Sequence, residues 1–117
     1  MEFNWKTKEN SQFINAIMSL ESRDEAERFL RDLMTEGEIA EFAKRLEVAR
    51  LLSRDTQYAS IIELTGLSST TIARISKWLK GSLGGYRLIL SRLASYSLKN
   101  HHHSLAKLGK GLSLKRT

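Results

Sequence analysis

The stretch LTGLSSTTIARISKWLK, residues 64 to 80, joins the end of one helical apolar pattern to the start of another. Its glycine is followed by a run of hydroxyl residues, and isoleucines then recur at helical spacing. Glycine commonly ends a helix in a left-handed conformation, and serine commonly begins one. The stretch therefore predicts two helices joined by a tight turn that starts at Gly66.

The spacing within residues 58 to 79 is typical of a helix-turn-helix motif. If Tyr58 is the first position, Ile61, Gly66, Ile72 and Ile75 occupy the places where the two helices pack and where the turn needs a residue without Cβ. The pattern departs from the usual one at Ile62, where a small residue is commoner. The spacing predicts a helical pair that packs through its isoleucines.

The rest of the chain also predicts helices, so we expect an all-α fold of six helices. The first spans residues 7 to 20. Capping boxes at Ser22 with Glu25 and at Thr35 with Glu38 begin the second and third helices. The fourth follows residues 55 and 56, and a turn at residues 82 to 85 precedes a sixth helix that ends near residue 98. We expect a helical domain over residues 1–99 and a flexible basic tail over 100–117.

The charges are divided unevenly along the 117 residues. All thirteen acids lie at or before Glu63, together with nine Lys/Arg, which gives that part a net charge of −4. Residues 64 to 117 carry ten Lys/Arg and no acid. Clustered cations gain affinity for phosphates through the release of counterions. This half indicates a polyanionic partner, the alternative being a solvated basic surface.

Composition excludes several other classes of protein. With no cysteine, the chain forms neither a disulfide nor a thiolate metal site, and we expect no metal at the adjacent histidines 101–103. No apolar run reaches the roughly 20 residues of a membrane span, so we expect no membrane partner and a cytoplasmic protein. The sequence contains no glycine-rich phosphate loop or nucleophile motif, and we expect no enzymatic activity.

The hydroxyl run at the start of the predicted second helix of the motif has two interpretations. Short side chains and free backbone N–H groups allow a helix N-terminus to approach phosphates and base edges. The other interpretation is that Ser68 caps the helix and its neighbours fill an exposed turn. We predict a DNA-binding surface formed by these hydroxyls and the cations that follow them: Ser68, Ser69, Thr70, Thr71, Arg74, Lys77 and Lys80. Arg87 and the tail are expected to contact phosphates.

The segments LMTEGEIAEFAKRLEVARLL and GLSSTTIARISKWLKG, followed by GGYRL, resemble the Trp repressor superfamily, and most closely its Trp-repressor-like YerC/YecD proteins. The resemblance covers roughly residues 10 to 98. It implies a six-helix subunit and an intertwined homodimer whose core is formed by the N-terminal helices and the last helix.

The resemblance also implies a possible ligand pocket. The tryptophan-binding member of the superfamily uses a threonine and two arginines, which Thr35, Arg45 and Arg74 match. It also needs a glycine and a serine where this chain has Ile75 and Trp78. We therefore expect no tryptophan cofactor. Trp78 either packs in the core or fills the pocket from within.

Together these features predict a sequence-specific transcriptional repressor that binds double-stranded DNA as a homodimer. The alternative is a helical protein-interaction or RNA-binding module with a basic tail.

Overall fold

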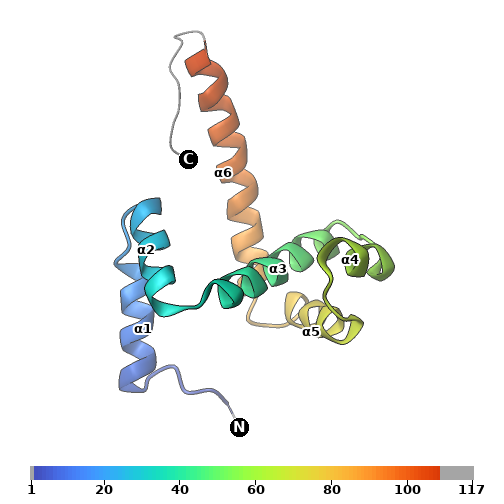
Figure 1. Cartoon of the computed structure of the whole chain (residues 1–117), viewed down its shortest axis with the longest axis horizontal. Coiled ribbons are helices and arrows are strands. Elements are labelled where there is room, and N and C mark those ends of the chain that lie inside the picture. The colour runs from blue at the N-terminus through green and yellow to red at the C-terminus, as the bar shows by residue number, and fades with distance from the viewer. Residues whose placement is uncertain (1, 109–117) are drawn as a thin grey trace. The chain divides into compact units, whose positions relative to one another are not determined.

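The computed structural model describes the backbone of residues 2–108 and the side chains of residues 2–96. Within that range all regular secondary structure is helical, as the sequence predicts. The elements are α1 (Lys8–Met18), α2 (Arg23–Leu33), α3 (Glu36–Ser53), α4 (Tyr58–Thr65), α5 (Ser69–Leu79) and α6 (Gly85–Leu108) (Figure 1). The chain divides into two compact units, Met1–Phe42 and Ala43–Thr117, and the division falls within α3.

Side-chain caps set the helix starts of the first unit. The Thr35 and Glu38 pair forms the reciprocal capping box that the sequence predicts: Thr35 Oγ1 accepts from the Glu38 N–H at 3.1 Å, and Glu38 Oε1 accepts from the Thr35 N–H at 2.9 Å. Ser22 Oγ likewise accepts from the Glu25 N–H, but the Glu25 carboxylate accepts from Glu21 rather than from Ser22. The α2 and α3 starts are thus determined locally.

The apolar side chains of the first unit stay accessible. Neither α1 nor α2 has a buried residue. The apolar side chains of α1 include Phe13 and Ile17, each 45% exposed, and Met18, which is 77% exposed. Apolar surface of this extent normally marks an interaction site.

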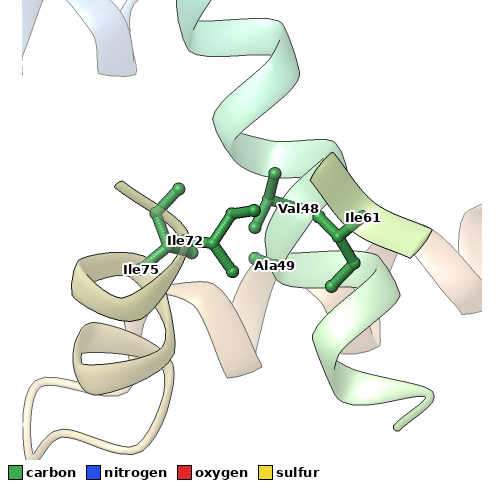
Figure 2. Packing of buried hydrophobic residues seen from close by; sticks show 5 residues of the cluster. All are labelled: Val48, Ala49, Ile61, Ile72 and Ile75. Atoms are coloured by element: carbon green, nitrogen blue, oxygen red, sulfur yellow. The ribbon is translucent and has the colours of Figure 1, made fainter. Parts of the chain in front are cut away.

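The core of the second unit lies between α3, α4 and α5. Its members are fully buried: Val48, Ala49, Ile61, Ile72 and Ile75. Figure 2 shows the two α3 residues between the α4 isoleucine and the two α5 isoleucines. Burial of each large aliphatic side chain stabilises the fold by about 1.5–3 kcal/mol. Ile61, Ile72 and Ile75, which the spacing of the motif predicts to be packing residues, therefore hold α5 against α3 and α4.

Two loops shape the second unit. Asp55, between α3 and α4, adopts a left-handed φ of 62°, which Asp tolerates better than most residues. Gly66 follows α4 with φ 76° and donates its N–H to the Ile62 carbonyl oxygen at 2.8 Å, as the sequence predicts. Thr65 is buried beside it: its Oγ1 donates to the Ile61 carbonyl oxygen at 2.7 Å and accepts from the Leu67 N–H at 3.3 Å. These bonds define the turn between α4 and α5.

The sixth helix differs from the sequence prediction at its C-terminal end. We expected the helical domain to end at residue 99, whereas α6 continues through this position to Leu108. Residues 109–117 of the expected tail lie outside the described residues.

Candidate nucleic-acid interface

Ser68 is the N-cap of α5, as the sequence predicts. Its Oγ accepts a hydrogen bond from the Thr71 N–H at 3.1 Å, and it also bonds to the Thr71 hydroxyl at 3.1 Å. Thr71 is half-buried, whereas Ser69 and Thr70 are exposed. The hydroxyl run is therefore divided: Ser68 and Thr71 close the helix end, and Ser69 and Thr70 remain available to a partner.

The exposed face of α5 carries two cations in line with Thr70. Arg74 and Lys77 follow it at spacings of four and three residues, which places all three on one side of a helix. Ile72 and Ile75, both fully buried, occupy the opposite side. The packing of α5 thus presents a hydroxyl and two positive charges to solvent.

Lys80 lies at the other end of α5. It is the C-cap residue and is exposed, and its N–H donates to the Ser76 carbonyl oxygen at 3.1 Å. With a rise of 1.5 Å per residue, it lies about 15 Å along the helix axis from Thr70. It therefore extends the positive charge along the helix rather than joining the hydroxyls.

Arg87 makes a structural contact within the chain, while the phosphate contact expected of it stays a prediction. Its Nη1 donates to the Leu79 carbonyl oxygen at 2.5 Å, which attaches the first turn of α6 to the last turn of α5. Its Nη2 lies only 3.0 Å from the point where a Cβ on Gly84 would stand. Gly84 has φ 70°, so both its conformation and its space favour glycine.

The three residues of the expected ligand pocket are distributed over both units. Thr35 belongs to the first unit, where its hydroxyl caps α3. Arg45 and Arg74 belong to the second. The Arg45 charge acts on Tyr86: burial raises the pKa of the Tyr86 hydroxyl, and the nearby guanidinium opposes that rise. The grouping of Thr35, Arg45 and Arg74 in one pocket stays a prediction.

The two residues that argue against a tryptophan site occupy different environments. Ile75 is fully buried in the core, but Trp78 is 48% exposed. Trp78 is therefore not packed in the core of this chain, which was one of the two interpretations of this residue.

Sequence reasoning missed an apolar hollow beside Trp78. It has a volume of about 720 Å³ and lies where α3, the end of α5 and the start of α6 meet. Its wall includes Leu46, Trp78, Leu83, Tyr86 and Ile89, with Lys77 among the polar residues. No short sequence pattern signals this hollow, because its wall is formed by residues from three helices, of which α3 is distant along the chain from the other two.

Two further features concern other kinds of site. Among the residues with described side chains, no group of three or more His, Cys, Asp or Glu residues could hold a metal ion, and the histidines at 101–103 lie outside that set. No helix in the described range has the length and apolar character needed to cross a bilayer.

Comparisons with known proteins place this architecture in a family. Residues 8–94 match the Trp repressor protein family. The uncharacterized protein YerC of Bacillus subtilis is 41% identical over 86 residues, which cover 74% of this chain and 83% of YerC.

Two crystal structures have the same fold. A TrpR-like protein from Eubacterium eligens is 38% identical, with a TM-score of 0.72 over 77% of this chain and 93% of that one. A Staphylococcus aureus protein provisionally assigned as a Trp repressor is 32% identical, with a TM-score of 0.70 over 76% of this chain and 89% of the other. Because residues 8–94 match the family and YerC is 41% identical, the chain belongs to the Trp repressor protein family.

Proposed function

We propose that this protein is a sequence-specific DNA-binding transcriptional repressor that acts as a homodimer. The observation that carries the proposal is the exposed face of α5, where Thr70, Arg74 and Lys77 are aligned opposite the buried isoleucines. A helix of this kind fits the major groove, where its first turn can reach base edges. Membership of the Trp repressor protein family supports the same function.

The α5 residues divide by chemistry into readers and anchors. Ser69 and Thr70 carry short, exposed hydroxyls at the helix start, which suits close approach to base edges. Arg74, Lys77 and Lys80 carry charge and suit contacts to phosphates. Ser68 and Thr71 stabilise the helix end that presents the readers, through their hydrogen bonds to each other.

Exposed apolar surface in both units supports the homodimer. Met18 and Leu33 are 77% and 48% exposed in the first unit, and Leu88 and Tyr96 are 51% and 61% exposed in the second. A second copy would cover such faces with the same residues on each side, as a two-fold interface does. Two copies would then present two α5 helices to two half-sites.

In this proposal the protein acts without tryptophan as a cofactor. The Ile75 side chain already fills its site in the core, so α5 is held by packing rather than by a ligand. The basic residues after 99 add phosphate contacts that do not depend on sequence.

The test is selection of bound duplexes from a random pool with the full-length protein. We expect enrichment of a sequence with two-fold symmetry whose half-sites are about 34–36 Å apart, or a multiple of that spacing. Binding should weaken as salt rises, because phosphate contacts release counterions. The proposal would be rejected if no sequence were enriched and the protein bound a random acidic polymer or RNA as well as it binds duplex DNA. That result would indicate a module that binds polyanions in general or another protein.

A further inference from the structure

The hollow beside Trp78 is an apolar surface that the second unit leaves open. Leu83, Trp78 and Ile89 line it and are 92%, 48% and 43% exposed. Its volume of about 720 Å³ falls in the range of sites that enclose a ligand or an inserted side chain. An open apolar concavity at the end of α5 needs an occupant that is apolar and bulky.

The N-terminal segment presents an apolar projection of matching character. Phe3 and Trp5 are the two aromatic residues outside helices in the described range, and they are 63% and 57% exposed. Their rings contact edge to face, with centroids 4.8 Å apart and an interplanar angle of 68°. We call these two rings the aromatic pair.

Hydrogen bonds hold the aromatic pair in a defined shape. Asn4, between the two rings, accepts from the Lys6 N–H through Oδ1 at 2.9 Å, and its carbonyl oxygen accepts from Asn10 Nδ2 at 2.8 Å. A preformed projection loses less conformational entropy on docking than a flexible one. The segment is therefore organised before it meets a surface.

We propose that the hollow is a socket for the aromatic pair of a second copy of this chain. Two aromatic rings supply large apolar area with few rotatable bonds, which suits a concave site of this size. The exposed apolar residues of α1, such as Phe13 and Ile17, and of α6, such as Leu88, indicate that a second copy covers both units. In a two-fold arrangement, each copy inserts its aromatic pair into the socket of the other.

The inference rests on the proposed homodimer and adds a function to it. The socket is formed partly by Lys77 and Trp78 of α5, so the partner's N-terminal segment would brace the end of the helix that reads DNA. The aromatic pair is then a positioning element: it contacts no DNA, and it links dimer assembly to the orientation of α5.

The absence of cysteine from the chain makes the test direct. Glu2→Cys places a thiol beside the aromatic pair without altering either ring, and Ser82→Cys places one in the wall of the socket. The two full-length variants are co-expressed with different tags and treated with a short thiol-to-thiol crosslinker. The matched control replaces Ser82→Cys with Glu63→Cys, an exposed position on α4, which does not line the hollow.

We expect a covalent heterodimer from Glu2→Cys with Ser82→Cys and none from the control pair. Adding Phe3→Ala and Trp5→Ala should reduce the crosslinked fraction about tenfold or more, because the apolar contact is lost. Two outcomes would overturn the socket and leave the homodimer unaffected. One is a crosslink that forms only within a single chain when Glu2→Cys and Ser82→Cys are combined in that chain. The other is the absence of any crosslink between the two chains of a protein that is shown to be a dimer. A monomeric mass at micromolar concentration would overturn both.

Fluorescence supplies a second readout, because Trp5 and Trp78 are the two tryptophans of the chain. In the Trp78→Phe variant Trp5 is the only tryptophan, so with excitation selective for tryptophan we expect its emission to be blue-shifted and shielded from iodide. Dilution that dissociates the dimer should shift the emission to the red. Emission typical of exposed tryptophan in a proven dimer contradicts the socket.

Discussion

Arg87 Nη1 donates a hydrogen bond to the carbonyl oxygen of Leu79 at 2.5 Å, so the first turn of α6 holds the last turn of α5. Carbonyl groups in the last turn of a helix have no partner within the helix, and a cation there also compensates the negative end of the helix dipole. This contact links the orientation of the proposed reading helix to α6, and it leads to the first prediction.

Replacing Arg87 with Gln should lower the free energy of unfolding by about 1 kcal/mol, since an exposed charge-assisted hydrogen bond is lost. Urea denaturation measures the change through the midpoint at constant slope. The matched control is Arg92→Gln, an exposed arginine further along α6, which should leave the midpoint unchanged. Equal effects of the two substitutions would mean that charge alone, and not the contact with Leu79, is responsible.

Gly84→Ala should lower the free energy of unfolding, whereas Gly85→Ala should not. Gly84 has φ 70°, and a Cβ there would stand 3.0 Å from Arg87 Nη2, whereas nothing lies within 4 Å of a Cβ on Gly85. A left-handed alanine costs about 1–2 kcal/mol, while alanine at a compatible glycine position stabilises a protein by about 0.4–1 kcal/mol. Thermal melting of the two variants should therefore shift in opposite directions, and a shift in the same direction would contradict the geometry of this turn.

Ile75→Ala should lower the free energy of unfolding by about 2–5 kcal/mol, the usual cost of truncating a buried isoleucine. Ile75 is fully buried, whereas Ile62, the control position on α4, is 38% exposed. Ile62→Ala should therefore lower the free energy of unfolding by a smaller amount. Chemical denaturation of the two alanine variants provides the comparison. If Ile75→Ala costs no more than Ile62→Ala, packing through Ile75 does not hold α5.

Three single alanine substitutions should have different effects on DNA binding. Thr70→Ala should alter or relax the preferred base at one position of each half-site, because a good base contact discriminates by about 1–3 kcal/mol. Lys77→Ala should weaken binding to every duplex and reduce the salt slope by about 1. Thr71→Ala should leave base preference intact, since that hydroxyl is bonded to Ser68.

The measurement for these variants is binding to a panel of single-base operator variants at two salt concentrations. A uniform loss of affinity from Thr70→Ala, with a changed base preference from Lys77→Ala, would show that α5 docks differently from our proposal.

The Glu47 and Arg50 pair should make a small pH-dependent contribution to stability. Hydrogen bonds from the Arg50 guanidinium, at 2.8 and 2.5 Å, lower the pKa of the Glu47 carboxyl. A lowered pKa in the folded state adds stability above the usual Glu pKa, and that stability is lost as pH falls through the folded value. Glu47→Gln should thus destabilise the protein at pH 7 by at most about 1 kcal/mol, because the pair is half-buried and still partly screened by solvent.

Urea titrations at pH 7 and pH 3 test this prediction. The difference between the Glu47→Gln variant and the unchanged protein should shrink at pH 3. A difference that is independent of pH would assign the effect to packing rather than to charge.

Local signals predicted most of the helix boundaries and the core. The Thr35–Glu38 capping box and the Ser68 cap require only neighbouring residues, so they can be read from the sequence. The left-handed Gly66 and the fully buried Ile72 follow from the spacing of the motif. Such features depend on contacts over one or two helical turns, which a single sequence encodes directly.

Features that depend on distant or external contacts were harder to predict. The apolar face of α1 is recognisable, but the exposure of Met18 shows that this chain does not bury it. The hollow beside Trp78 arises where three helices meet, and no short pattern encodes it. The length of α6 was underestimated because residues 99 to 108 lack strong apolar periodicity, although they also contain no glycine or proline to end a helix.

The hydrogen bonds of Thr65 give the α4–α5 turn a thermodynamic consequence. Its hydroxyl bonds to both Ile61 and Leu67, so the turn is already closed in the free chain. A helical pair in this state has no backbone to order when it meets a rigid partner. The heat-capacity change of association should therefore match the apolar area buried at the contact, without the additional heat-capacity change of a segment that folds as it binds.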